Sequence, residues 1–184
     1  MKKKFRVYLR SFEPGDHLLL HKWRSDPEIA IPFSATMRFT STLNEQKWLE
    51  DRVFDKNSVS CAICLKETDE FIGCIFISKI DMLHKNGVAG WFVGEKKHWG
   101  KGYATDALVL MLRHAFYDKG LERVWSGVFE DNMGSLKMAE KCGFKVEGLM
   151  RKAYYVDGSF KNSVVVGVLR EDFEAVLADY EDIV

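Results

Sequence analysis

The chain has 184 residues, of which 47% are hydrophobic, 13% aromatic and 29% charged. This length and composition predict one soluble globular domain over residues 1–184 and exclude a disordered or low-complexity chain. The 27 basic residues (Lys and Arg) balance the 27 acidic ones (Asp and Glu), and a zero net charge argues against a general nucleic-acid-binding protein. Residues 1–10 hold five basic side chains and residues 171–184 hold six acidic ones, which we interpret as solvated ends.

The sequence contains no membrane or secretion signal that we can identify. Its longest apolar runs, such as residues 164–169, fall far short of the roughly 18 residues that a spanning helix needs, and the basic start has no apolar run behind it. We therefore expect a cytoplasmic protein with reduced cysteines. Cys61 and Cys64 form a C-x-x-C, but their spacing within an expected strand puts the two thiols on opposite faces. His17 and His21 lack a third ligand in phase, so we expect no metal.

The first third of the chain predicts a strand, two helices and an irregular segment. Residues 7–12 alternate like a strand, and Asp16 is the expected N-cap of a helix over 17–24 that ends before Pro27. Residues 26–40 have no clear period and carry Glu28, Phe33, Arg38 and Phe39, which either line a pocket or pad the core. Thr42 and Glu45 form a capping-box pattern that begins a helix over 42–54.

The rest of the chain mixes strands and helices. The further expected strands are 58–66, 71–80, 88–93, 123–129, 144–155 and 160–169, and the further expected helices are 105–119, 132–142 and 171–180. Gly120 and Gly143 suit the ends of two of these helices, and Asp157-Gly158 predicts a hairpin turn. This order is not a regular alternation of strand and helix, so it predicts an α/β (α+β mixed) protein, with a mixed central sheet and helices on both faces, rather than a Rossmann fold.

The sharpest local feature is the segment 94–106, Gly-Glu-Lys-Lys-His-Trp-Gly-Lys-Gly-Tyr-Ala-Thr-Asp, between an expected strand and an expected helix. A glycine-rich loop that leads into a helix N-terminus is an anion site, because backbone N–H groups point outward and the helix dipole favours negative charge. Lys96, Lys97 and Lys101 would add positive charge. A P-loop is excluded, because Gly102 stands where Ser or Thr must ligate magnesium, and a Rossmann fingerprint is excluded because Thr105 replaces its third glycine.

The remaining pattern, Gly100-x-Gly102-x-Ala104 after a strand, resembles the pyrophosphate loop of the GNAT acetyltransferases. Three further segments resemble that superfamily in the same order: residues 9–28, the N-x-x-S and E-K-x-G-F patterns of residues 132–144, and the closing hairpin around Asp157-Gly158. The resemblance covers nearly the whole chain. It is strongest to the branch of ribosomal-protein N-terminal acetyltransferase-like and spermidine acetyltransferase-like proteins.

The resemblance implies a GNAT fold, with a sheet of about seven strands splayed between the fourth strand (88–93) and the fifth (123–129). Acetyl-CoA would bind in this splay as cosubstrate, with no metal, and its pantetheine arm would pair with Phe92 and Val93. The residues implied in binding its pyrophosphate are Lys97, His98, Trp99, Gly100, Lys101, Gly102, Tyr103, Ala104 and Thr105. Lys97 stands where the superfamily usually has Gln or Arg. The closing hairpin would pair two copies into a homodimer.

The implied reaction is direct attack of a primary amine on the thioester in a ternary complex. Such a reaction needs a base, an oxyanion donor and an acid for the leaving thiolate. The superfamily's usual acid, a tyrosine, is replaced here by Ala139. We therefore expect Ser135 to protonate the thiolate, Asn132 to contact the cofactor or order water, and Glu130 to take a proton through water. Further candidate bases or amine-holding groups are Asp131, Glu28 and Glu147, and further donors are Tyr103, Tyr154 and Tyr155.

The acceptor stays open among a protein N-terminus, a polyamine, an aminoglycoside and another small amine. The absence of an acidic cluster in residues 26–40 favours an α-amine or a small molecule over a polyamine. A non-catalytic acyl-CoA-binding or regulatory module is the alternative from another class, and the missing tyrosine supports it. We expect no nucleic-acid or membrane partner.

Overall fold

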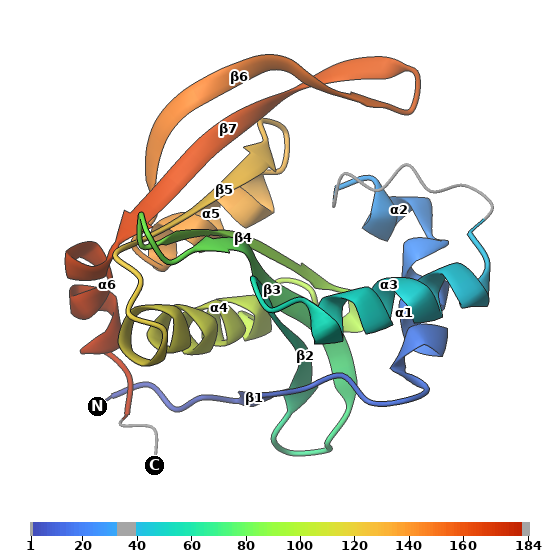
Figure 1. The fold of residues 1–184 in the computed structure, drawn as a ribbon, viewed down its shortest axis with the longest axis horizontal. Coiled ribbons are helices and arrows are strands. Elements are labelled where there is room, and N and C mark those ends of the chain that lie inside the picture. Colours follow the sequence, from blue (N-terminus) through green and yellow to red (C-terminus); the bar gives the residue numbers. More distant parts are fainter. Residues whose placement is uncertain (1, 33–39, 182–184) are drawn as a thin grey trace.

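The computed structural model describes residues 2–32 and 40–181, and its centre is a seven-stranded sheet in the order β1-β2-β3-β4-β5-β7-β6 (Figure 1). All neighbouring strands pair antiparallel except β4 and β5, which pair parallel. The expected mixed α/β sheet is therefore confirmed. Its strands are β1 (Val7–Arg10), β2 (Val59–Leu65), β3 (Phe71–Asp81), β4 (Asn86–Val93), β5 (Arg123–Phe129), β6 (Lys145–Val156) and β7 (Ser159–Leu169).

Helices cover both faces of the sheet. The helices are α1 (Asp16–Arg24), α2 (Pro27–Ala30), α3 (Thr42–Phe54), α4 (Tyr103–Arg113), α5 (Met133–Lys141) and α6 (Arg170–Leu177). Apolar side chains of α1, α2 and α3 form one core with β2, β3 and β4, and those of α4, α5 and α6 form a larger core on the opposite face. None of the helices in the described part of the chain combines the length and apolarity that a membrane span requires.

The N-cap residues of two helices, α1 and α3, differ from the expectation by one residue, although α3 spans 42–54 as expected. Gly15, in the left-handed region at φ +100°, is the N-cap of α1, while the Asp16 carboxylate instead accepts from the Arg10 guanidinium at 2.7 and 3.0 Å. Ser41, not Thr42, caps α3 by accepting from the Asn44 N–H. Glu45 is not part of a capping box, because it lies buried in an ion pair with Arg24 at 3.0 Å.

Helix α4 begins two residues earlier than expected and continues as a π-helical turn, η2 (His114–Asp118), in which the Lys119 N–H donates to the His114 carbonyl. Gly120, at φ +66°, ends this helical stretch as predicted. The four cysteines are free, and Cys61 and Cys64 face the two different cores, as the strand alternation predicted. Burial raises the pKa of the Cys61 thiol to about 11.

The hairpin of β6 and β7 extends the sheet beyond β5 and arches over the molecule (Figure 1). Strand β6 is the edge strand, and most of its side chains are exposed. Exposed large apolar side chains gather on this hairpin: Val146, Leu149, Met150, Tyr154, Tyr155 and Phe160.

The feature that positions the site is the junction of β4 and β5. The two strands pair only from Asn86 to Val88 on β4, opposite Arg123 to Trp125 on β5. Beyond this point β4 follows β3 and β5 follows β7. The sheet therefore opens between its fourth and fifth strands, as predicted.

Candidate functional site

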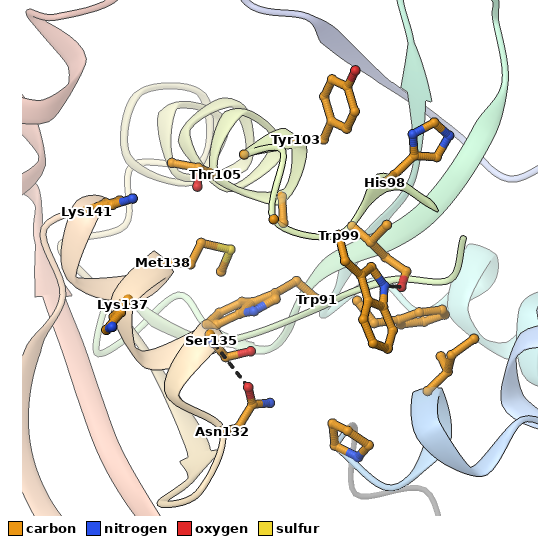
Figure 2. A pocket seen from close by; sticks show the side chains of 18 of the residues that line it. Trp91, His98, Trp99, Tyr103, Thr105, Asn132, Ser135, Lys137, Met138 and Lys141 are labelled. Carbon is orange, nitrogen blue, oxygen red and sulfur yellow. Dashed lines mark hydrogen bonds between the residues drawn. The ribbon is translucent and has the colours of Figure 1, made fainter. Parts of the chain in front are cut away.

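A cavity of about 450 Å³ lies where β4 and β5 diverge (Figure 2). Its walls come from the end of β4, the loop before α4, the first turn of α4, one face of α5 and residues of and next to α2. The lining residues are Glu28, Ile29, Pro32, Trp91, Phe92, Val93, His98, Trp99, Gly100, Gly102, Tyr103, Ala104, Thr105, Asn132, Gly134, Ser135, Lys137, Met138 and Lys141. Of the residues expected to form the site, Lys97, Lys101 and Glu130 are not in this lining.

Backbone groups on the open edge of β4 point into the cavity. Gly94 donates its N–H to the Ile72 carbonyl on the β3 side, and Val93 pairs in register with Gly73. Because backbone groups alternate in direction along a strand, those of Val93 and Trp91 face away from β3. The Ala89 carbonyl has the same direction and accepts from the Ser126 hydroxyl of β5 at 2.9 Å. Trp91 and Val93, rather than Phe92, therefore offer backbone groups to a ligand.

The loop before α4 supplies a second set of backbone donors. Gly100 and Gly102 adopt φ +72° and +83°, and no side chain caps α4. The first N–H groups of a helix have no intrahelical partner, so those of Tyr103, Ala104 and Thr105 are available to an anion. The N–H groups of His98 and Trp99 are not available, because they close the 3₁₀ turn η1 (Lys96–His98) by donating to Glu95 and Lys96.

Arg6, just before β1, holds this loop in place. Its guanidinium donates to the Lys101 carbonyl at 2.8 Å and to the Asp106 carboxylate at 2.8 Å, and it lies over the Tyr103 ring. Asp106 is buried in the first turn of α4 and also faces the Tyr180 hydroxyl. Burial, together with the Asp106 charge, raises the pKa of Tyr180 to about 12. Arg6 and Asp106 thus join the two ends of the chain to the anion-binding loop.

Two of the three loop lysines, Lys96 and Lys97, do not supply the positive charge that the sequence led us to expect from them, and Lys101 does not line the cavity. Lys96 is paired with Asp26 at 2.7 Å and with Glu28 at 2.6 Å, and these carboxylates raise its pKa. Lys97 is paired with Glu70 at 2.6 Å, and this hydrogen bond lowers the pKa of the Glu70 carboxyl. The charges of both lysines are therefore already compensated by carboxylates.

Lys137 and Lys141 of α5 take over this role. Both line the cavity (Figure 2), and neither has a carboxylate within ion-pair distance among residues 2–32 and 40–181. Their spacing of four places them on one helix face, one turn apart. Together with the amides of α4, they make this end of the cavity suited to phosphate groups. The sequence interpretation missed them, although the same helical periodicity links them to the expected site residues of α5.

Helix α5 also brings Asn132 and Ser135 into the cavity. The Asn132 side-chain oxygen accepts from the Ser135 N–H at 3.1 Å and so caps α5, which leaves the Ser135 hydroxyl to the cavity (Figure 2). Ala139 is fully buried in the larger core and does not line the cavity.

The candidate bases lie apart from this centre. Glu130 accepts from the Asn162 amide at 3.1 Å, Asp131 pairs with Lys161, and Glu147 pairs with Arg123. Tyr154 and Tyr155 belong to the exposed hairpin, whereas Tyr103 does line the cavity. Glu28 is the one carboxylate lining the cavity among the described residues, and it enters from α2, where Lys96 holds it. Phe33, Arg38 and Phe39 lie outside the described residues.

The cavity is therefore asymmetric. One end offers free amides and two lysines, the middle offers the open edge of β4 beside the Ser135 hydroxyl, and the α2 end offers a carboxylate. This arrangement fits an elongated ligand with anionic groups at one end, amide groups along its length and a reacting group near Ser135. The described residues contain no cluster of three His, Cys, Asp or Glu side chains that could hold a metal ion.

Comparison with known proteins gives one family. The model described as the acetyltransferase (GNAT) domain matches residues 6–145. An uncharacterized N-acetyltransferase, p20, from Bacillus licheniformis is 28% identical over 171 residues, which are 91% of this chain and 95% of that protein. The ribosomal-protein-serine acetyltransferase of Escherichia coli is 29% identical over 92 residues, about half of each chain (50% and 51%).

The structure of spermidine N-acetyltransferase from Vibrio cholerae, in complex with CoA and spermine, superposes with a TM-score of 0.84 and 18% identity. The alignment covers 92% of this chain and 98% of that one. At this identity the similarity shows a shared fold.

Gly102→Ala tests the loop, with Gly158→Ala as the matched control. The two glycines have nearly the same φ, +83° and +82°, and Gly158 lies in the hairpin turn with open space around it. We expect both substitutions to lower the free energy of unfolding by about 1–2 kcal/mol, because each forces a left-handed alanine. Only Gly102→Ala should also weaken coenzyme A binding about tenfold or more, measured by calorimetry. Equal affinities in the two variants would remove Gly102 from the binding loop.

The double change Lys137→Ala/Lys141→Ala tests the source of positive charge, with Lys97→Ala as control. We expect the Kd for coenzyme A to rise about tenfold in the double variant and to stay within about twofold in the control, because Lys97 is already paired. Binding of pantetheine, which lacks the nucleotide phosphates, should be the same in all three proteins. A larger loss of coenzyme A affinity in Lys97→Ala than in the double variant would show that the loop lysines supply the positive charge.

Proposed function

We propose that this chain, which belongs to the GNAT acetyltransferase family, transfers an acetyl group from acetyl-CoA to a primary amine inside the cavity between β4 and β5. Acetyl transfer to an amine is the chemistry of the family and of its relatives named N-acetyltransferases. The observation that carries the location is the open edge of β4, which ends beside the free amides of α4. Acetyl-CoA supplies the acetyl group in activated form, as a thioester.

Acetyl-CoA would lie along the cavity, with its phosphate groups at the end that carries the free amides and the two lysines, and its thioester farther toward the α2 end. Tyr103, Ala104 and Thr105 would donate their N–H groups to the pyrophosphate, and Lys137 and Lys141 would compensate its charge. Val93, nearest the loop, would pair through its backbone with an amide of the pantetheine arm. This leaves the Trp91 N–H, farther along the open edge and beside Ser135, to donate to the carbonyl oxygen of the thioester, where negative charge develops during attack (Figure 2).

Three residues would serve the bond changes. The amine nitrogen forms a bond to the acetyl carbon, and the carbon–sulfur bond breaks. Glu28 would hold the ammonium at the α2 end and accept its proton through water. Ser135 would give its hydroxyl proton to the departing sulfur and take up the second proton of the attacking nitrogen, which restores the hydroxyl. Asn132 would keep Ser135 in place by capping α5. Glu130, expected from the sequence to be the base, is held by Asn162 outside the cavity, so we no longer assign it this role.

The acceptor we propose is a monoamine, either the α-amine of a peptide or a small molecule. The V. cholerae relative was crystallised with spermine, and the E. coli relative is named for a ribosomal protein, so both kinds of amine occur among the similar proteins. In this chain Glu28 is the only carboxylate lining the cavity among the described residues, and it shares Lys96 with Asp26. A polycation would find little net negative charge there.

A cytoplasmic location, a single domain and a homodimer formed through the β6–β7 hairpin stay predictions. The four free cysteines support the first, because thiols stay reduced in that compartment. The exposed apolar side chains on the hairpin support the last.

The test of the function is release of free thiol from acetyl-CoA with four amines: a peptide with a free α-amine, a small-molecule monoamine, spermidine and an aminoglycoside. We expect the peptide or another monoamine to have the highest kcat/KM, about tenfold or more above spermidine. Glu28→Gln should raise the KM for the amine and leave that for acetyl-CoA unchanged. Spermidine as the best acceptor would overturn the acceptor assignment. Tight acetyl-CoA binding without thiol release to any amine would instead favour the non-catalytic module.

Ser135→Ala tests the acid, with Ser159→Ala in the hairpin turn as control. The substitution keeps the Ser135 N–H that Asn132 needs, so α5 stays capped. We expect kcat to fall about tenfold or more and the Kd for acetyl-CoA to stay unchanged, because only the proton donor is lost. A loss of less than threefold in kcat would show that Ser135 only packs or caps.

A further inference from the structure

Lys96, the first residue of η1, places its ammonium group between the two carboxylates at the α2 end of the cavity. Its Nζ lies 2.7 Å from Asp26 Oδ2 and 2.6 Å from Glu28 Oε2. The other oxygen of Asp26 accepts from the Glu28 N–H at 3.0 Å and so caps α2. Three of the four carboxylate oxygens are thus engaged within the protein. The space between the two carboxylates is filled by an ammonium that the chain itself supplies.

These two carboxylates are the acidic groups that a cationic ligand would meet at this end. Glu28 lines the cavity, and Asp26 lies two residues before it. Residues 26–40 contain no further Asp or Glu. Without Lys96 the two groups would carry two negative charges beside the cavity, and with it their sum is one. Lys96 is not part of the cavity lining, so it acts on a ligand through these carboxylates.

We infer that Lys96 determines the class of amine that the cavity accepts, because it occupies the carboxylates to which the further ammonium groups of a polyamine would bind. This rests on the proposed function, in which Glu28 holds the ammonium of the acceptor. A monoamine needs only the Glu28 oxygen that does not contact Lys96. A polyamine brings further ammonium groups to the same end, where Lys96 repels them and already pairs with Asp26.

The exposure of the three side chains fits a role in specificity better than a role in stability. The side chains of Lys96 and Glu28 are 41% and 72% exposed, whereas both partners of the Arg24–Glu45 pair are buried. Exposed ion pairs contribute little to the free energy of unfolding, because water and salt screen them. Removal of Lys96 should therefore change the charge beside the cavity and leave the fold intact.

The experiment replaces Lys96 by methionine, which removes the charge and keeps an unbranched side chain. Lys97→Met is the matched control, because Lys97 is the next residue and its partner Glu70 does not line the cavity. We expect the ratio of kcat/KM for spermidine to that for a small-molecule monoamine to rise about tenfold in Lys96→Met and to stay within about twofold in the control. Calorimetry on the coenzyme A complex, in which no transfer occurs, should show a similar gain in spermidine affinity.

Two further measurements separate the effect of charge from a change of shape. In the double variant Lys96→Met/Asp26→Asn the amide can still cap α2 but the second negative charge is gone, so the ratio should return toward the wild-type value. The gain in Lys96→Met should also shrink when the salt concentration rises from about 0.1 M to about 1 M, because the Debye length falls from about 10 Å to about 3 Å.

An unchanged ratio in Lys96→Met, or an equal gain in Lys97→Met, would overturn the inference. A gain that persists in full in the double variant or at high salt would overturn it as well. If Lys96→Met does not fold, Lys96→Gln makes the same comparison. A wild-type protein that releases no thiol with any amine would contradict the proposed function instead, and the spermidine affinities from calorimetry would still test the role of Lys96.

Discussion

The architecture depends on one interruption in hydrogen bonding, the divergence of β4 and β5 after three residue pairs. Each half of the sheet satisfies its own backbone groups: β4 continues along β3, and β5 continues along β7. The groups of β4 and β5 that face the gap beyond these three pairs lose their strand partner. Backbone groups buried without a partner cost free energy, so a gap of this kind persists only if water, side chains or a ligand take the missing bonds. Ser126 takes one at Ala89, and Trp99 takes one at Val93. The remaining groups give the chain a ligand site made of main chain.

The strands and the anion loop follow from local patterns and could be predicted from the sequence, whereas the place of the gap was implied only by the resemblance to the GNAT proteins. Alternation, the glycine spacing at Gly100 and Gly102 and the Asp157-Gly158 turn act over a few residues, so neighbours in sequence determine the outcome. The resemblance to the GNAT proteins then located the cavity. The errors in the predicted N-cap residues had a different origin. At the start of α3, Ser41 and Thr42 are both residue types that favour the N-cap position. Glu45 fits a capping box in the sequence, but in the fold it pairs instead with Arg24, which is distant in the chain.

The charge distribution in the site could not be predicted in the same way, because each ion pair joins residues far apart in the chain. Lys96 pairs with Asp26 and Glu28, which lie about seventy residues earlier in the chain. Lys97 pairs with Glu70, which lies in the connection between β2 and β3. A count of lysines near a glycine loop therefore overstates the charge that a ligand meets. The lysines that remain for the ligand, Lys137 and Lys141, sit on a helix whose inward face also carries Ser135 and Met138. Their helical periodicity was visible in the sequence, but the direction of that face depended on tertiary packing.

The same separation of charges explains how a neutral chain can hold a polyanionic cosubstrate beside a cationic acceptor. Carboxylates neutralise Lys96 and Lys97, so the lysine charge that lines the cavity comes from Lys137 and Lys141 of α5. At the opposite end, Glu28 keeps one carboxylate oxygen on Lys96, which limits the negative charge that an amine meets. Between these ends lie groups with no net charge: the edge of β4, the Ser135 hydroxyl and the Trp99 ring. A thioester held there is attracted strongly to neither end, so its position depends on main-chain hydrogen bonds to β4. The place of the reacting carbonyl would then be determined by the strand, whereas affinity for the cosubstrate would be electrostatic, and substitution of Lys137 and Lys141 should lower the affinity without moving the thioester.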